Sequence, residues 1–155
     1  MIIKAFLPCR SGSQRVKNKN IRKFANYSFG LFQLKIEQLV KVNQFKEIIV
    51  STDDLKIINY LKKKKYKKVR CITRPKKLAL SSTRTDELIH YAAKFFDKND
   101  HILWTHVTSP LFDTNDYNKA IDVYIKNKKT YDTLIGCNII QEFIFNKKKP
   151  INYNY

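Results

Sequence analysis

Segments with the spacing of buried strands alternate with segments with the spacing of amphipathic helices along most of this chain. Apolar residues recur every three or four positions at 31–42, 55–61, 86–96 and 115–126, which predicts four helices. Short apolar runs predict strands at 2–7, 45–50, 67–73, 101–107 and 131–137, and leave a sixth strand open at 142–146. This alternation predicts an α/β fold with a mostly parallel sheet and helices on both faces.

Local signals indicate how some of these elements begin. Thr52 or Asp53 is expected to cap the second helix, and Thr114 or Asn115 the fourth, because short polar side chains accept hydrogen bonds from the first helical N–H groups. The stretch 21–24 is expected to be a short extended piece before a turn.

The totals favour one domain over residues 1–155. No internal repeat or linker interrupts the 155 residues, and 43% of them are hydrophobic. Three widely spaced cysteines without a C-x-x-C pair suggest neither a disulfide framework nor a zinc site. The first strand follows the N-terminus without a cationic leader, and no apolar stretch reaches about 18 residues. These features predict a cytoplasmic protein without a membrane partner.

The net charge of +18, from 31 Lys and Arg against 13 Asp and Glu, predicts polyanionic partners or phosphorylated small molecules. A nucleic-acid-binding protein is one alternative. It is the less favoured one, because the basic residues are spread along the chain and no RRM, KH or helix-turn-helix pattern appears.

The stretch LPCRSGSQRVKNKN, residues 7–20, directly follows the first predicted strand. It places four cations among small polar residues, and Gly12 allows a tight turn. Cations and backbone N–H groups at the carboxyl end of a strand can hold an anion, although a solvated basic loop has the same composition. Polar clusters also follow the other strands, and the carboxyl ends of parallel strands share one edge of a sheet. These other polar clusters lie at 51–54, 74–85 and 105–109. Their convergence with the first loop favours a phosphate site over a solvated loop.

Familiar phosphate and nucleophile motifs are missing. The sequence contains no G-x-x-x-x-G-K-[ST], G-x-G-x-x-G or G-x-S-x-G. Cys9 and His106 both lie at strand ends, so a Cys–His nucleophile is conceivable, but a neutral thiol is the commoner case at such a position. Asp53 and Asp54 are interpreted as helix caps rather than metal ligands, and no residue is assigned to a metal.

Several ordered motifs together resemble one enzyme family. They are Leu7–Arg15 with Lys17–Ile21, Val50–Asp54, Arg74-Pro75 with Leu78-Ala79, Thr85–Leu88, Thr108–Leu111 and Pro150–Tyr153. In this order and spacing they are similar to motifs of the acylneuraminate cytidylyltransferases, the CMP-sialic acid synthetases, which are relatives of the CMP-Kdo synthetases. The resemblance covers essentially the whole chain.

The resemblance implies a Rossmann-like three-layer fold of the nucleotide-diphospho-sugar transferase type. It also implies a cytidylyltransferase that transfers CMP from CTP to a sialic acid or a related nonulosonic acid and releases pyrophosphate. Arg10 and Lys19 would be the catalytic cations that grip the triphosphate. The nucleotide-binding residues would be Arg10, Ser11, Gly12, Ser13, Arg15, Lys19, Asn20, Arg74, Thr85, His106, Thr108 and Ser109.

The chain departs from the family pattern at three positions and in its length. Gln14 replaces a usual Lys, His106 a frequent Gln, and Ser81 a common Asp. The family's chain continues past the position matched by Tyr155, into the dimerisation segment, much of the sugar-acid pocket and two aspartates expected to bind Mg²⁺. We therefore expect Mg²⁺ dependence with ligands outside this chain, and a homodimer or a complementing C-terminal chain. A nucleotide-binding remnant without catalysis is the main alternative.

Overall fold

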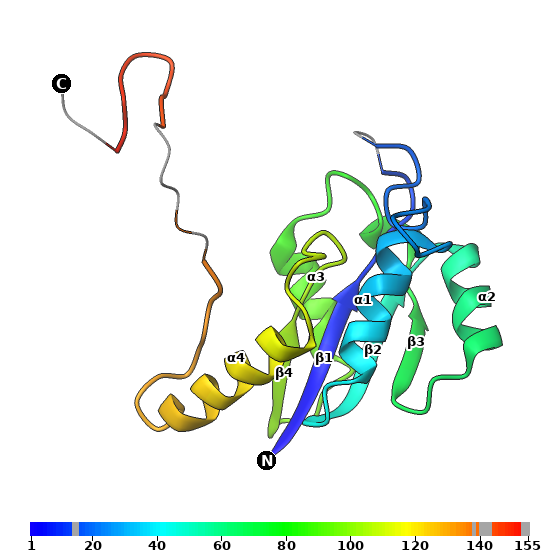
Figure 1. Ribbon diagram of the computed structural model, residues 1–155, viewed down its shortest axis with the longest axis horizontal. Coiled ribbons are helices and arrows are strands. Elements are labelled where there is room, and N and C mark those ends of the chain that lie inside the picture. Colours follow the sequence, from blue (N-terminus) through cyan, green and yellow to red (C-terminus); the bar gives the residue numbers. More distant parts are fainter. Residues whose placement is uncertain (14–15, 138, 140–143, 153–155) are drawn as a thin grey trace.

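A computed structural model describes residues 1–13, 16–137, 139 and 144–152, and its centre is a parallel sheet. The strands are β1 (Ile2–Pro8), β2 (Phe45–Thr52), β3 (Val69–Thr73) and β4 (Asp100–Trp104). They lie in the order β3-β2-β1-β4, so the first strand of the chain is central (Figure 1). The predicted α/β fold with a parallel sheet is confirmed.

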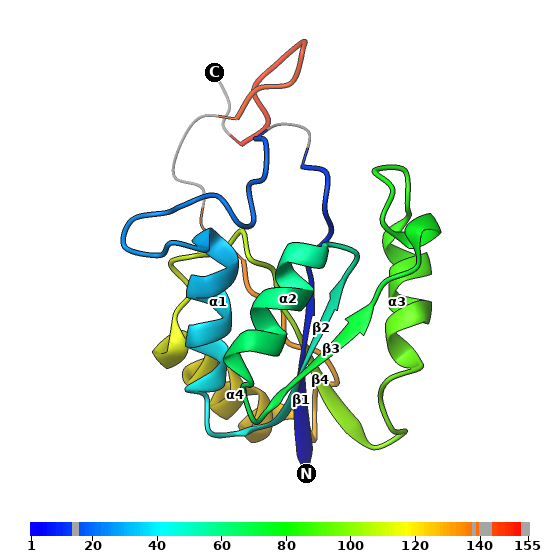
Figure 2. The same cartoon turned by 90° about the vertical axis from the view of Figure 1, so that its right-hand side faces the viewer.

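Helices cover both faces of the sheet, as predicted. Three of them, α1 (Gly30–Val40), α2 (Leu55–Lys64) and α4 (Thr114–Asn127), pack on one face, and α3 (Thr85–Ala93) packs on the other (Figure 2). A short 3₁₀ turn, Lys76–Leu78, precedes α3. None of the described helices is long and apolar enough to cross a membrane.

The alternating side chains of β1 explain why both faces are covered. Ile3, Ala5 and Leu7 belong to the larger apolar core under α1, α2 and α4. Phe6 points the other way, into a smaller core with α3, where its ring centroid lies 4.7 Å from that of Trp104. Successive residues of a strand face opposite sides of a sheet, so an apolar run of this kind needs a layer on each side.

The fifth predicted strand is wrong. Residues 131–137 form no strand and are exposed, and Figure 1 shows this segment leaving α4 away from the sheet. A strand needs a neighbouring ladder for its N–H and C=O groups, and apolar content alone does not supply one. Of the possible sixth strand, 142 and 143 lie outside the described residues. Its remainder makes one isolated bridge, between Phe145 and Pro150.

The observed caps of α2 and α4 are neither of the two residues predicted for each helix, but the residue next to the predicted pair. The side chain of Asp54 accepts a hydrogen bond from the N–H of Lys56 at 2.9 Å and caps α2. Asp113 caps α4, and the side chain of Asp116 accepts in return from the N–H of Asp113 at 3.1 Å. The predicted extended piece at 21–24 is instead a series of turns that ends in a single bridge to Tyr27.

Candidate functional site

The register of the sheet brings the carboxyl ends of all four strands to one end of the molecule. Pro8 pairs with Ser51, and Phe6 pairs with Trp104. On the other side of β2, Thr52 pairs with Thr73. The polar segments that follow these four strands therefore start from neighbouring positions, as open α/β sheets require of a ligand site.

The loop after β1 is tied to β2 through Asp53. One carboxylate oxygen of Asp53 accepts from the N–H of Ser11 at 2.8 Å, and the other accepts from the Ser11 hydroxyl at 2.5 Å. This N–H group was expected to face a phosphate, but it already donates to Asp53. Within the described residues, the N–H groups of Gly12 and Ser13 have no acceptor. Gly12 has a φ of +68°, a conformation that suits glycine.

Asn20 closes the same loop from its other end. Its side-chain amide donates to the carbonyl of Arg10 at 2.9 Å, and its own carbonyl accepts from the N–H of Phe32 in α1 at 2.8 Å. One residue thus joins the end of β1 to the first turn of α1. The side-chain amide that was expected to contact the nucleotide has this structural partner.

Gly30 allows the loop to lie directly against α1. It has a φ of +63°, and a Cβ there would lie 2.1 Å from the carbonyl oxygen of Arg22. Because that oxygen is backbone, no rotamer change relieves the clash. The glycine therefore fixes how closely the 18–22 turns, which carry Lys19, approach the helix.

Arg74 lies beneath the loop rather than at its surface. It is 4% exposed, and its guanidinium donates to the Ser51 hydroxyl at 3.1 Å and to the Ser51 carbonyl at 2.7 Å. Burial lowers its pKa, and the charge of Asp53 opposes that shift. Arg74 was predicted to wall the nucleotide. In the structure its donors hold the end of β2, next to the residue that anchors the β1 loop.

Among the described cations of the loop, Arg10 and Lys19 are half-buried, whereas Lys17 is exposed. Arg10 makes one long hydrogen bond, 3.4 Å, to the carbonyl of Ala79, so the segment after β3 borders the β1 loop. The Lys19 ammonium makes no hydrogen bond or ion pair with any described residue. Among the described residues, neither charge therefore has an acidic partner within ion-pair distance.

The segment after β4 supplies a third side of the site. The N–H of Thr105 donates to the carbonyl of Phe6 at 3.0 Å, which keeps this segment beside β1. The indole N–H of Trp104 donates to Nε2 of His106 at 3.2 Å. In the neutral ring Nδ1 then carries the proton and can donate to a ligand. Partial burial lowers the pKa of His106, which favours this neutral form.

The structure thus brings only some of the predicted site residues together. The structure brings the loop residues Arg10 to Ser13, Lys19 and Asn20 together at the end of β1, with Arg74 below them. Thr108 and Ser109 are exposed after β4, in the same strand-end region. Thr85 starts α3, is exposed, and makes no side-chain hydrogen bond to the described part of the loop. Arg15 lies outside the described residues.

The Cys–His nucleophile is not supported. Cys9 is 1% exposed, and burial raises the pKa of its thiol to about 12, so the thiol stays protonated at neutral pH. Nε2 of His106 already accepts from Trp104, and the two residues share no hydrogen bond.

No metal cluster is found in the part of the chain that the structure describes. No group of three His, Cys, Asp or Glu side chains there is placed to hold an ion. These residues do not offer a preformed Mg²⁺ site, and Asp53 has both oxygens engaged by Ser11.

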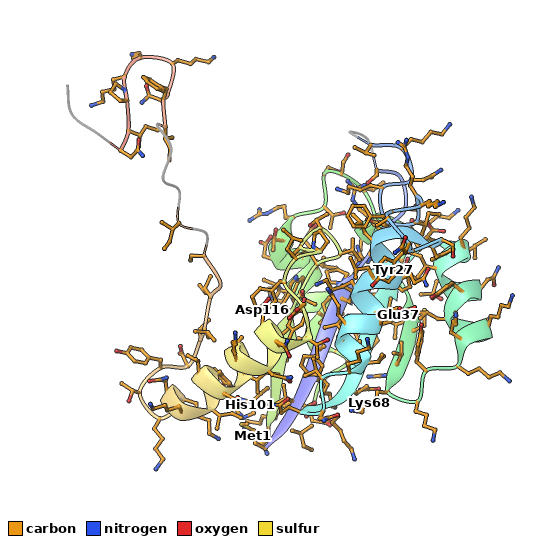
Figure 3. The ribbon with its side chains drawn as sticks, in the orientation of Figure 1. Met1, Tyr27, Glu37, Lys68, His101 and Asp116 are labelled. Atoms are coloured by element: carbon orange, nitrogen blue, oxygen red, sulfur yellow. The ribbon has the colours of Figure 1, made fainter. Side chains whose placement is uncertain are left out.

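An open hollow of about 380 Å³ lies at the opposite end of the strands. Figure 3 shows that end, with Met1, Lys68 and His101 labelled there and Tyr27 on the side of the loops. The hollow contains none of the predicted site residues. It is lined by Lys4, Lys46, Glu47, Lys67, Lys68, Val69 and Arg70.

Two residues that shape the site were missed in the sequence. Asp53 was interpreted only as a helix cap, although the Asp53-Asp54 pair offers one carboxylate for the cap and one for the loop. Lys35 was not noticed at all. Its spacing from Phe32 and Leu39 places it on the inner face of α1, and a lysine there is a signal in itself.

Comparison with known proteins identifies the family of this chain. Residues 4–151 match the family described as cytidylyltransferase. The chain belongs to the cytidylyltransferase family. A search of curated proteins found no match.

Solved structures share the fold of this cytidylyltransferase family member at low sequence identity. One is CMP:2-keto-3-deoxy-manno-octonic acid synthetase complexed with CTP, with a TM-score of 0.63, 18% identity, and coverage of 82% of this chain and 48% of that one. A second is 4-diphosphocytidyl-2C-methyl-D-erythritol synthase from Anaerococcus prevotii, with a TM-score of 0.58, 19% identity, and coverage of 81% and 52%. A third is a cytidylyltransferase from Leptospira borgpetersenii, with a TM-score of 0.58, 20% identity, and coverage of 83% and 50%. The chain spans about half the length of these structures.

Proposed function

We propose that this chain binds CTP at the β1 loop and transfers CMP from it to a nonulosonic acid of the N-acylneuraminate type, with release of pyrophosphate. The observation that carries the proposal is the loop itself. Asp53 and Asn20 hold its two ends. Among the described residues, the Lys19 ammonium has no hydrogen-bond or ion-pair partner, and Arg10 makes one long hydrogen bond, to Ala79. The family match supplies the nucleotide class.

The loop can serve phosphoryl transfer by positioning and by charge. In the proposed reaction a hydroxyl of the sugar acid attacks the α-phosphorus and loses its proton to solvent. The bond from that phosphorus to the bridging oxygen breaks, and pyrophosphate leaves with the bonding electron pair. Negative charge grows on the leaving phosphates, so fixed cations stabilise the transition state more than the ground state. Arg10 and Lys19 fill this role. Loss of either one is expected to cost about 2–4 kcal/mol of transition-state stabilisation.

The nucleoside end of CTP would then lie towards the segment after β4. The Nδ1–H of His106 and the hydroxyls of Thr108 and Ser109 are polar groups that suit the ribose and the acceptor atoms of cytosine. The sugar-acid acceptor rests on the resemblance of the ordered motifs to the acylneuraminate enzymes. A solved neighbour that is named for 2-keto-3-deoxy-manno-octonic acid supports a sugar acid in general.

Pyrophosphate release tests the proposal directly. The protein is incubated with CTP and Mg²⁺, with and without N-acetylneuraminate or 2-keto-3-deoxy-manno-octonic acid, and the CMP-sugar is identified by mass spectrometry. We expect release that needs a sugar acid, is faster with N-acetylneuraminate and stops with EDTA. Faster release with 2-keto-3-deoxy-manno-octonic acid would move the acceptor to that class. Magnesium dependence stays a prediction until the EDTA arm is measured.

The alternative is a protein that binds the nucleotide without turnover. The same protein preparation can distinguish it from the enzyme. Calorimetry with CTP is run on the wild type, on Lys19→Ala, and on Lys63→Ala as a matched control, since Lys63 is an exposed lysine of α2 far from the loop in sequence. Affinity that is lost only in Lys19→Ala, without any pyrophosphate release, would establish a nucleotide-binding protein. Absence of both binding and turnover would remove the site and the activity together.

A further inference from the structure

Lys35 is a charged side chain in the apolar core. It lies on the inner face of α1 beside Phe32, Ile36 and Leu39, and all four residues have no exposed surface. Desolvation makes a buried ammonium costly unless its donors are satisfied. A lysine at this position therefore needs a specific set of partners.

The partners of Lys35 come from the segment after β4. Its Nζ donates to the carbonyl of Ser109 at 2.9 Å and to the carbonyl of Phe112 at 2.7 Å. It also lies 4.9 Å from the centroid of the Tyr117 ring in α4, which starts beside α1 (Figure 3). Two carbonyls and one aromatic face match the three N–H groups of an ammonium.

These contacts hold one turn, formed by Ser109–Phe112. The N–H of Phe112 donates to the carbonyl of Ser109 at 3.2 Å and closes it. The side-chain amide of Gln38, one helical turn after Lys35, donates to the carbonyl of Pro110 at 3.0 Å. Three carbonyls of the turn therefore face α1. The side chain of Leu111 faces away and is 91% exposed.

The charge on Lys35 matters for this geometry. A neutral amine has two N–H groups and a lone pair, and here that lone pair would oppose a carbonyl oxygen or the negative face of an aromatic ring. Burial lowers the pKa of Lys35 to about 8, and the charges of Asp113 and Asp116 oppose this shift. The ammonium form therefore predominates at pH 7.

We infer that Lys35 is a positioning residue: its ammonium group holds the Ser109–Phe112 turn in the conformation that presents Thr108 and Ser109 to the nucleoside end of CTP. The inference rests on the proposed function for the identity of the ligand. Lys35 itself touches no substrate, because it is fully enclosed and acts through backbone carbonyls.

The first test measures the turn without any ligand. Hydrogen exchange is followed by mass spectrometry in the wild type, in Lys35→Met, and in Lys63→Met, which removes an exposed charge from α2. We expect exchange in 105–114 to be faster by about tenfold in Lys35→Met only, since two hydrogen bonds are lost, with β1 and β2 unchanged. Lys35→Gln keeps a hydrogen-bond donor, so its exchange rate should lie between those of the wild type and Lys35→Met. If Lys35→Met does not fold, the same comparison is made with Lys35→Gln. Equal exchange in all variants would overturn the inference.

The second test asks whether the turn serves the nucleoside. CTP and inorganic triphosphate are titrated into the same variants. Lys35→Met should bind CTP about tenfold more weakly and triphosphate as well as the wild type does, because the β1 loop is untouched. Equal weakening of both ligands would indicate general structural damage and overturn the positioning role. If the wild type binds no CTP, the proposed function fails, and hydrogen exchange alone decides whether Lys35 orders the turn.

Discussion

Replacing Lys35 by Met should change how the stability of this protein depends on pH. In the unfolded chain Lys35 has its usual pKa of 10.5, and in the folded protein burial lowers that pKa to about 8. The groups that face it are Asp113 and Asp116 at the start of α4, the Tyr117 ring, and the carbonyls of the Ser109–Phe112 turn. Burial raises the pKa of Tyr117 to about 12, so its ring stays neutral up to pH 10.

The sign follows from proton counting. Between pH 8 and pH 10.5 the unfolded chain binds the Lys35 proton and the folded protein largely does not, so the free energy of unfolding rises with pH in that window. Below pH 8 both states are protonated, and the buried charge costs its full amount. The gap between the two pKa values corresponds to about 3 kcal/mol, of which about 2–3 kcal/mol is recovered between pH 7 and pH 10.

The Lys35→Met variant has no such proton. Its free energy of unfolding minus that of the wild type should therefore fall by about 2–3 kcal/mol between pH 7 and pH 10. Urea denaturation followed by circular dichroism at pH 7, 8, 9 and 10 measures this difference. Titration of all other groups is shared by both proteins and cancels. A matched Lys63→Met variant should show a flat difference. A Lys35→Met difference that is also flat, or that rises with pH, would refute the buried-ammonium reasoning.

Three other perturbations test separate parts of the site. Gly30→Ala should lower the free energy of unfolding by at least about 2 kcal/mol in urea denaturation, because the new Cβ meets backbone, whereas Gly136→Ala in open surroundings should change it by under about 0.5 kcal/mol. Asp53→Ala should weaken CTP binding by about tenfold or more in calorimetry through loss of the loop anchor, whereas Asp54→Ala should cost about 1 kcal/mol of stability as a lost cap and leave CTP affinity intact. Cys9 should stay unlabelled by a thiol reagent at pH 7.5 until the protein unfolds; rapid labelling of the folded protein would contradict its burial.

The parts of the fold that the sequence predicted well are those with strong local periodicity. The strand at the N-terminus is a near-continuous apolar run, and α1 carries an apolar face, so each element was recognisable without its neighbours. The 131–137 run has fewer apolar residues, with Asp, Thr and Gly among them, and it pairs with no strand in the described part of the chain. Composition reports the capacity to form a strand, and pairing depends on the rest of the sheet.

The candidate site divides in the same way. The β1 loop was recognisable because cations, glycine and short polar residues follow a strand directly. The distances that shape the loop join residues far apart in the chain: Ser11 to Asp53, Arg74 to Ser51, and the turn after β4 to Lys35. No local sequence pattern contains two residues so far apart. The hydrogen-bond partners of Asp53 and Lys35 could therefore be found only in the structure.

The basic residues around the site fall into two kinds, and the distinction bears on how the site works. Arg74 and Lys35 are buried, and their donors are taken by Ser51 and by the carbonyls of the turn after β4. Arg10 and Lys19 are half-buried, and between them they make one long hydrogen bond to the described residues. Buried cations that are hydrogen-bonded to the backbone hold it in place, because moving them would leave a buried charge unpaired. Cations without partners leave their binding capacity for a ligand. The net charge of +18 therefore does not show how the cations at the strand ends divide: two are buried and hydrogen-bonded to the fold, and two are half-buried with few partners among the described residues.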